Sequence, residues 1–413
     1  MAALKGSVSL LSSVVKLASG NVAAQIIPFV ALPFLARLYS PQDFGHLAFF
    51  MALCTFLSIL MALRFDVALV SVSEAKQKMA LLSAGRRMAI FLACCIFIIL
   101  SIALLAGIVN QHYGWFLPVS ALALAIHNLH VGWLNANEHY SAISGFLVLR
   151  ALLWVGIAGA WPFVLPEVEL GIVYAFAASY ILVSVIEYCF IAVLTSATAL
   201  EKVSVIQVVK AFKDFPKFNL PHALLSNVNA SAPAYVLQFF GLTQILGQFS
   251  QTNRLIMTPW HMVSNALYRV LYQHCAKTLQ SEHPNLSKVG KLWGGYSAVA
   301  IVFYFILYFI ATPLFILVLG EQWREAGRVA QIMMPWFALR TITGVLAFMP
   351  ILREKQHIAL IFEMFYTGAM IASLGLGAVL YDGLTALSWF SWVGTFFVLI
   401  QLSWYLGLIK SKP

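Results

Sequence analysis

The sequence predicts an all-α polytopic membrane protein. Of its 413 residues, 62% are hydrophobic and only 10% are charged, whereas charged residues make up roughly 25% of ordinary soluble domains. Windows of about 19 residues are repeatedly apolar enough to cross roughly 30 Å of hydrocarbon as helices. Runs such as residues 90–109, IFLACCIFIILSIALLAGIV, are apolar on every side and lack the alternation of barrel strands.

Twelve transmembrane helices are expected, one for each apolar run between polar or basic breaks. They are placed at residues 13–36, 44–63, 88–109, 115–136, 142–163, 170–194, 219–240, 246–270, 295–319, 328–352, 357–380 and 384–408. A basic break divides them into two predicted six-helix bundles, residues 1–200 and 201–413. The halves show a weak repeat, because in each an Asn- and Pro-containing helix leads to a glycine, Gly45 or Gly247, that opens the next helix. Repeated halves are the usual build of secondary transporters.

Basic residues concentrate in alternate breaks, at 64–87, 195–218 and 271–294 and near both ends of the chain. The opposite breaks hold few cations and several acids, among them Asp43 and Asp382. The positive-inside rule therefore predicts that both termini are cytoplasmic. The net charge of +10 is then explained by topology, and no nucleic-acid partner is expected.

The motifs of several enzyme classes are absent from the sequence. There is no GxxxxGK[ST] phosphate loop, no HExxH and no pair of catalytic carboxylates. Extracytoplasmic breaks are short, whereas membrane glycosyltransferases and polymerases generally carry catalytic acids on a sizeable outer loop. The five cysteines fall in or near apolar helices, so no disulfide framework, metal site or catalytic residue is expected. The sequence thus favours a transporter over an enzyme.

Four stretches carry a family resemblance. They are SPQDFGHLAFFMALCTFLSILMALRFDVALV, FPKFNLPHALLSNVNASAPAYVLQFFG, GQFSQTNRLIMTP, and LGEQWREAGRVAQIMMPW leading to LREKQ. In order and spacing they resemble the polysaccharide transporters called Wzx or O-antigen flippases. The resemblance implies the superfamily of multidrug and oligosaccharidyl-lipid exporters, in which two six-helix bundles (MATE-like) face a central cavity. It also implies the substrate, an oligosaccharide on undecaprenyl diphosphate that is moved from the cytoplasmic to the periplasmic leaflet of a bacterial inner membrane.

A diphosphate within the membrane requires cationic partners, which Arg and Lys supply through charge-assisted hydrogen bonds. Ionisable residues inside membrane segments are functional candidates by default. The expected cavity cations are Arg254, Arg340, Arg150 and Lys16. The alternatives are ion pairs of these arginines with Glu187 or Glu363, or snorkelling to the interface.

Other candidate residues are grouped by expected role. Polar cavity positions that contact sugars, or hold helices together, are Asn21, Gln25, Asn219, Asn227 and Asn229. Gating or ion-coupling positions are Arg64, Asp66, Arg269, Glu187 and Glu363. Helix bending is expected at Pro28, Pro33 and Pro233. Histidines such as His127, His130, His222 and His261 can titrate near neutral pH, although packing is the expected role of any single one.

The predicted function is alternating-access translocation of undecaprenyl-diphosphate-linked repeat units for O-antigen, capsule or exopolysaccharide synthesis. No cofactor is expected, and coupling to a proton or sodium gradient is left open. The expected partners are the lipid-linked oligosaccharide, membrane lipids, and the polymerase and chain-length regulator of the same pathway. Alternatives are a MATE-like small-molecule exporter, a lipid II flippase with two further helices, and a membrane enzyme of glycan polymerisation or ligation.

Overall fold

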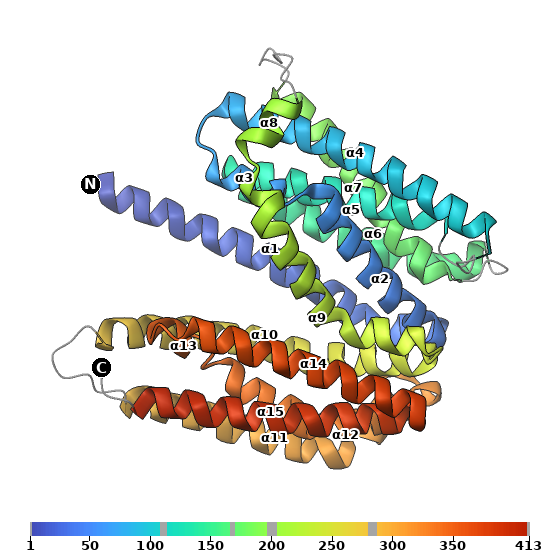
Figure 1. Cartoon of the computed structure of the whole chain (residues 1–413), viewed down its shortest axis with the longest axis vertical. Helices are drawn as coiled ribbons and strands as arrows, with labels where there is room; N and C mark the ends of the chain where they lie inside the picture. Colours follow the sequence, from blue (N-terminus) through green and yellow to red (C-terminus); the bar gives the residue numbers. More distant parts are fainter. Residues whose placement is uncertain (1, 108–113, 166–169, 196–204, 280–286, 411–413) are drawn as a thin grey trace. The chain divides into compact units, whose positions relative to one another are not determined.

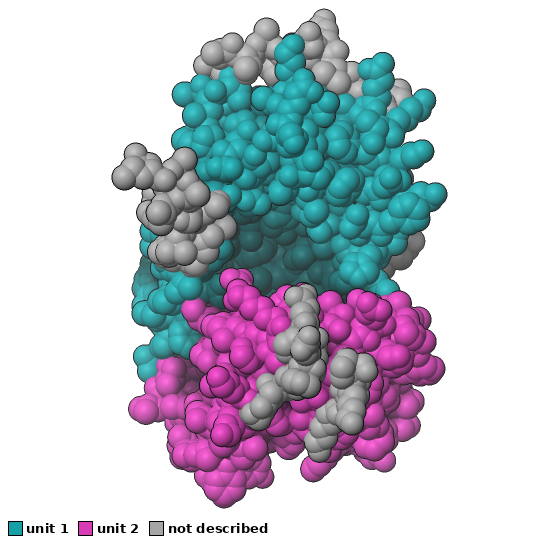
Figure 2. All heavy atoms as spheres, turned by 90° about the vertical axis from the view of Figure 1, so that its left-hand side faces the viewer, with its two compact units in different colours: residues 1–39, 46–231 teal, residues 40–45, 232–413 magenta. Residues whose placement is uncertain are grey.

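The computed structural model describes residues 2–107, 114–165, 170–195, 205–279 and 287–410, with the backbone alone for residues 2–19, 205, 206, 279, 287 and 410. All regular secondary structure in these ranges is helical (Figure 1). Contacts between Cα atoms divide the chain into two compact units, coloured separately in Figure 2. Unit 1 comprises residues 1–39 and 46–231, and unit 2 comprises residues 40–45 and 232–413.

The helices of unit 1 follow one another with short connections. They are α1 (Ala2–Leu38), α2 (Pro41–Ala62), α3 (Phe65–Ser71), α4 (Ala75–Leu105), α5 (Phe116–Ala136), α6 (Tyr140–Val164), α7 (Gly171–Thr195), α8 (Val205–Ala211), the π-helix η1 (Phe215–Asn219) and most of α9 (Leu220–Phe239). The first turn of α2 is assigned to unit 2, and α9 passes from unit 1 into unit 2.

Unit 2 continues with the remaining helices. They are α10 (Thr243–Leu279), α11 (Ser287–Leu319), the 3₁₀ helix η2 (Glu321–Trp323), α12 (Arg324–Gly344), α13 (Met349–Leu352), α14 (Gln356–Leu380) and α15 (Gly383–Lys410).

Each of the twelve expected helices corresponds to a long helix in the described ranges. Ten of these have the length and apolar character of a membrane span, and α9 and α10 are the two long helices that do not. The chain is therefore a multi-pass membrane protein. The polar composition of α9 and α10, which follow each other along the chain, sets them apart as helices with faces suited to polar groups.

The expected helix boundaries are wrong at several basic breaks. Helix α4 begins at Ala75 rather than 88, α10 runs to Leu279 rather than 270, and α11 begins at Ser287 rather than 295. The short helices α3, α8, η1 and α13 were not expected. Lys and Arg are good helix formers, so basic segments that cannot lie in hydrocarbon still continue the helices beyond it.

The division into units falls within α9, whereas the sequence places the boundary between the bundles at 200/201. The difference arises because α8 packs against α4, and Val208 of α8 joins the buried core of unit 1. The predicted halves, defined by repeated helices, and the compact units, defined by contacts, are thus different divisions of the same chain.

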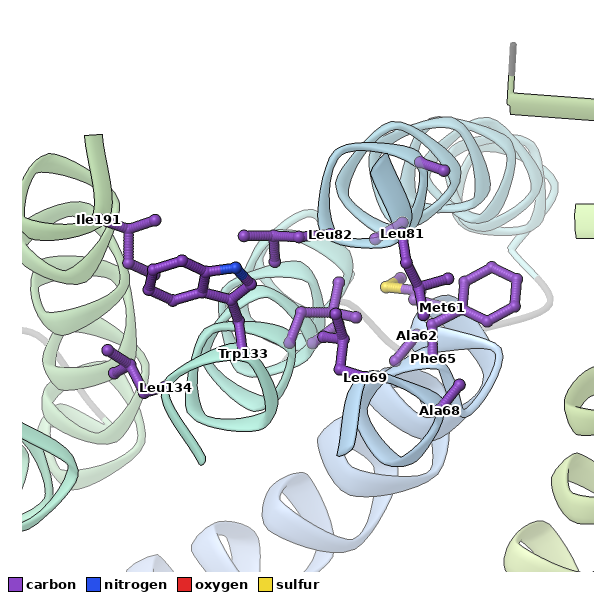
Figure 3. Close-up of a cluster of buried hydrophobic side chains, with 14 of the residues drawn as sticks. Met61, Ala62, Phe65, Ala68, Leu69, Leu81, Leu82, Trp133, Leu134 and Ile191 are labelled. Atoms are coloured by element: carbon purple, nitrogen blue, oxygen red, sulfur yellow. The ribbon is translucent and has the colours of Figure 1, made fainter. Parts of the chain in front are cut away.

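The core of unit 1 is built around α5, which packs against α3, α4, α6 and α7. Its apolar window is 67% buried, more than that of any other candidate span described. Figure 3 shows part of this core, in which Trp133 of α5 lies near Leu82 of α4 and Ile191 of α7. Because a buried polar group on α5 has no water available, it must find partners on these neighbouring helices.

Helix α12 occupies the corresponding place in unit 2, where it packs against α10, α11 and α15. The window that contains it is 61% buried. Helices α14 and α15 pack together beside it. Side chains of α12 are therefore positioned by three neighbours, which limits the rotamers open to them.

Candidate functional site

Unit 1 contains a buried polar cluster, called the relay here and formed by Arg86 of α4, His127 and His130 of α5, and Glu187 of α7. The Glu187 side chain is fully buried. Its Oε1 lies 2.8 Å from Nδ1 of His127, and its Oε2 lies 3.2 Å from Nδ1 of His130. The histidines are three residues apart and so share one face of α5. Two ring N–H groups thus supply the donors that a carboxylate away from water requires.

Arg86 completes the relay on the far side of His130. Its Nε donates to Nε2 of His130 over 3.0 Å, and its guanidinium lies 4.8 Å from the centre of the Tyr188 ring. One of its terminal nitrogens is buried and has no hydrogen-bond partner among the described residues. The relay therefore joins three helices through one cation, two imidazoles and one carboxylate.

Arg150 of α6 reaches the relay through an aromatic ring. Its guanidinium lies 4.9 Å from the centre of the Tyr180 ring, and that ring meets the His127 ring edge to face at 5.4 Å. The Nε of Arg150 is buried and has no hydrogen-bond partner in the described part of the chain. Arg150 is thus a membrane-depth cation held by a cation–π contact, without an acid directly beside it.

Glu187 does not pair with Arg254 or Arg340, which was one alternative; it pairs with His127 and His130 in its own unit. The sequence predicts that Arg86 lies in a cytoplasmic segment between two helices. In the structure α4 begins at Ala75, so Arg86 lies within α4 and contacts His130 of the relay. The sequence does contain a pattern that indicates this cluster: two histidines spaced i, i+3 in one apolar helix and an acid in another.

Unit 2 contains a second cluster, called the Arg340 cluster and formed by Trp336 and Arg340 of α12 and Tyr366 of α14. The guanidinium lies 5.1 Å from the centre of the Trp336 ring. Arg340 donates to the Tyr366 hydroxyl over 3.2 Å, and the Trp336 indole donates to the same oxygen over 3.0 Å. Because this hydroxyl accepts two hydrogen bonds, its own proton remains available as a donor.

The Arg340 cluster has hydrogen-bond donors beyond those used in its internal contacts. Trp336 and Tyr366 are buried, whereas Arg340 is exposed. A guanidinium has five N–H donors, and those not directed at Tyr366 can bind an oxyanion beside the free hydroxyl proton. A positioned arginine fork suits phosphate oxygens better than a flexible ammonium group does.

Aromatic and polar side chains of α10 and α11 lie in the same unit. The Trp260 ring stacks with the Tyr304 ring, with centres 5.9 Å apart and planes 22° apart. The Tyr304 hydroxyl lies 2.8 Å from the Thr341 hydroxyl of α12. One face of α10 is exposed and largely polar, with side chains at four-residue intervals: His261, Asn265, Arg269 and Gln273.

The remaining predicted cations and acids are spread along the chain. Arg254 is half-buried on α10, and Arg269 lies on the exposed face of that helix. Glu363 is exposed on α14, one turn before Tyr366. Lys16 belongs to α1, but its side chain lies outside the described residues.

Arg64 and Asp66 are brought together, as expected, at the turn between α2 and α3. Arg64 Nη1 lies 3.4 Å from Asp66 Oδ2. Burial raises the pKa of the Asp66 carboxyl above its ordinary value, although Arg64 acts in the opposite direction. The backbone of Arg64 is left-handed, with φ 60°, as is that of Leu63, with φ 49°. Two such non-glycine residues cost about 1–3 kcal/mol each, so this turn is held by the packing around it.

The side chains predicted to contact sugars differ in solvent exposure. Asn21 and Gln25 are exposed on the same face of α1, Asn219 is exposed at the end of η1, and Asn227 and Asn229 are half-buried on α9. The prolines lie inside continuous helices: Pro28 and Pro33 in α1, and Pro233 in α9. Their roles in sugar contact and helix bending stay predictions.

The fold is that of the transporters of the MOP superfamily. The chain is similar to lipid II flippase MurJ in an inward closed conformation, with 12% identity, a TM-score of 0.67, and 96% of this chain and 88% of that chain covered. It is similar to an inward-facing multidrug resistance MATE family transporter, with 14% identity, a TM-score of 0.64, and 94% and 96% covered. A MOP superfamily transporter from Pyrococcus furiosus matches with 13% identity, a TM-score of 0.54, and 97% and 94% covered.

Residues 34–328, well over half of the chain, match the family described as polysaccharide biosynthesis proteins. The chain belongs to this family. No relative is found among curated proteins.

Proposed function

We propose that the chain is a flippase that moves undecaprenyl-diphosphate-linked oligosaccharides across a bacterial inner membrane. The observation that carries this proposal is the combination of family and fold, because a polysaccharide biosynthesis protein is built here as a MOP-type transporter. The lipid II flippase with a related fold supports a lipid-linked sugar as the substrate class.

The charge of the clusters supports an anionic substrate. Membrane-depth cations with donors to spare occur in both units, at Arg150 and in the Arg340 cluster. The acid at comparable depth in unit 1, Glu187, is already engaged by two histidines. A diphosphate transferred out of water needs such charge-assisted partners, since each unpaired charge costs several kcal/mol.

The sugars require a different surface, and α9 and α10 supply candidates for it. Neither helix is apolar enough to count among the ten candidate spans. The exposed face of α10 presents amide, imidazole and guanidinium groups, which hydrogen-bond hydroxyls. We assign sugar contact to Asn227 and Asn229 on α9 and, separately, to Arg269 on α10, with Asn21 and Gln25 in the same role on α1.

Alternating access is the proposed transport mechanism, with the lipid tail remaining in the bilayer. Proline-containing α1 and α9 are the helices proposed to bend, since proline removes a backbone hydrogen bond. The basic breaks support cytoplasmic termini. A polymerase and a chain-length regulator are proposed partners, because a flipped repeat unit must next be joined to a growing chain.

A small-molecule exporter is the second candidate, and the multidrug transporter with a similar fold favours it. Such a protein should bind cationic or neutral compounds, and the cationic clusters of both units argue against this. A glycan polymerase or ligase is the third candidate, which would retain activity on substrate already in the outer leaflet.

Replacing Arg340 by alanine in cells that depend on this chain for surface glycan tests the proposal. We expect loss of the surface polymer, with lipid-linked single repeat units accumulating inside the cell. The control is Arg328→Ala on the same helix, because Arg328 is exposed and its ion pair is local, with Glu325 at 2.6 Å. Normal glycan in both variants would remove Arg340 from the site, and accumulation on the periplasmic side would favour an enzyme.

A further inference from the structure

The relay of unit 1 is not required by the proposed binding of a diphosphate, since its carboxylate is directed at histidines. We propose that the relay is a proton-binding site, that His127 is the residue that takes the proton, and that His130 stays neutral. The part of this inference that links the proton to transport rests on the proposed function; the proton site itself does not.

The hydrogen bond from Arg86 fixes the state of His130. A guanidinium has only donors, so Nε2 of His130, at 3.0 Å from Arg86 Nε, accepts and carries no proton. The ring proton is then on Nδ1, where it is donated to Glu187 Oε2 at 3.2 Å. Protonating Nε2 would place two N–H groups against each other beside a fixed positive charge. His130 is therefore held as the neutral Nδ1–H tautomer.

His127 has the same acid but no cation at its other nitrogen. Its Nδ1 donates to Glu187 Oε1 over 2.8 Å. Among the described residues, His127 makes its side-chain hydrogen bond through Nδ1 and not through Nε2, so the lone pair of Nε2 is open to a proton. Uptake forms one N–H bond at Nε2 and breaks none in the relay. The resulting imidazolium then faces the Glu187 carboxylate directly.

The net charge of the relay limits its capacity to one proton. With both histidines neutral, Arg86 and Glu187 sum to zero, so one added proton gives a single positive charge. A second proton on His130 would bring two imidazoliums and a guanidinium around one carboxylate. The relay thus has the capacity for one proton, and its place is His127.

A sodium ion fits the relay poorly. Hard cations require several oxygen ligands, and both oxygens of Glu187 already accept from ring nitrogens. Among the described residues, no group of three or more His, Cys, Asp or Glu side chains is placed to hold a metal ion. The ring donors would have to leave before a cation could bind.

Other ionisable groups lie on the helices packed against α5 and α7. These groups are Arg86 on α4, His130 on α5, Arg150 on α6, Tyr180, Glu187 and Tyr188 on α7, Asp66 on α3 and Arg64 just before α3. The neighbour of greatest consequence is Arg150, because its guanidinium and the His127 ring both contact the Tyr180 ring. A proton at His127 therefore changes the potential at a cation that we assign to substrate, and this links proton occupancy to transport.

The test is a pH titration of the full chain in lipid nanodiscs with ¹⁵N-labelled histidine, followed by NMR of the ring nitrogens. The chain has 10 histidines, and the signals lost in His127→Gln and His130→Gln assign the pair. We expect His127 to gain a second ring proton, at Nε2, as the pH is lowered, while His130 keeps a single protonated Nδ1. A His127 that does not titrate, or a His130 that does, would overturn the proton site.

The same two variants separate the proton from transport. Glutamine at 127 keeps a donor for Glu187 but cannot take a proton, whereas glutamine at 130 reproduces both the donor to Glu187 and the acceptor for Arg86. In proteoliposomes, we expect the pH dependence of flipping to be lost in His127→Gln and retained in His130→Gln. If His127→Gln does not fold, His127→Asn takes its place.

The outcomes distinguish the two proposals. Flipping by the wild type with an unchanged pH profile in His127→Gln would overturn the link to transport and leave the proposed function intact. A wild type that flips no lipid-linked sugar at any pH would overturn the proposed function, and the NMR titration would still decide the proton site.

Discussion

Gly247 lies where the first turn of α10 crosses the first turn of α2, and replacing it by alanine should destabilise unit 2. An added Cβ would lie 1.7 Å from the Pro41 carbonyl oxygen and 2.9 Å from the Gly45 nitrogen, whereas real Cβ atoms essentially never approach within 3.0 Å. Gly45 is equally tight, since its Cβ would lie 1.9 Å from the Thr243 carbonyl oxygen. Both obstacles are backbone atoms, so no side chain can rotate away.

The magnitude follows from that geometry. Overpacking typically costs about 1–3 kcal/mol, and a backbone obstacle places Gly247→Ala near about 3 kcal/mol. Since about 1 kcal/mol shifts the midpoint of a unit of this size by roughly 2–4 °C, we expect the thermal midpoint to fall by about 6–12 °C. Thermal unfolding of the purified protein in detergent, followed by tryptophan fluorescence, measures this shift.

The matched control is Gly156→Ala in α6, where an added Cβ meets nothing within 4 Å. Alanine is favoured over glycine in a helix by up to about 1 kcal/mol, so this variant should unfold at the same temperature or higher. Equal midpoints for Gly247→Ala and Gly156→Ala would refute the close crossing of α2 and α10.

Three further predictions concern single side chains. Arg340→Lys keeps the charge but loses the planar fork, so binding of an undecaprenyl-diphosphate sugar to the purified protein should weaken about tenfold; unchanged affinity would argue against a fork. Glu187→Gln leaves the relay without its carboxylate and should cost about 3 kcal/mol in thermal unfolding, whereas Glu325→Gln, in an exposed pair, should cost under about 1 kcal/mol. At the start of α15 the Thr385 side chain and then its backbone N–H, which donates to Asp382 over 2.9 Å, lower the pKa of the Asp382 carboxylate through hydrogen bonding. The stabilisation is therefore present above the ordinary pKa and lost as the pH falls through the lowered one, so the difference between wild type and Asp382→Ala, about 1 kcal/mol near neutrality, should vanish in strong acid.

The helical membrane fold could be predicted because apolar runs report burial in hydrocarbon directly. The apolar runs that form α4 and α15 can be recognised as membrane spans without knowing which helices pack against them, because length and hydropathy are local properties. The ends of α4 and α10 could not be predicted in this way. Their basic turns fall outside the apolar runs of the sequence, where composition no longer separates helix from loop.

The candidate sites were predicted in part. Arg340 and Glu187 stand out in the sequence as charges within apolar helices. Trp336, one turn before Arg340, was within reach of a periodicity argument, but Tyr366 comes from another helix and required the packing of α14. The relay likewise needed the register of α4 against α5, which brings Arg86 to His130 and which no local pattern specifies.

Gly45 and Gly247, which the sequence singled out as a weak repeat, are both required by close helix packing. Gly45 and Gly247 occupy similar places after the first helix of each predicted half. They also meet at one crossing, where each lacks room for a Cβ. The sequence repeat itself stays a prediction, but the requirement for glycine at both positions has a physical reason.

Translocation in proteoliposomes tests the central claim most directly. Vesicles that contain the purified chain and a labelled undecaprenyl-diphosphate oligosaccharide are treated with a lectin that cannot cross the membrane, and the protected fraction is followed with time. The account predicts that wild-type protein exposes the inner-leaflet substrate much faster than protein-free vesicles do, and that Arg340→Ala loses most of this gain. Equal rates with and without the protein would contradict the assignment as a flippase.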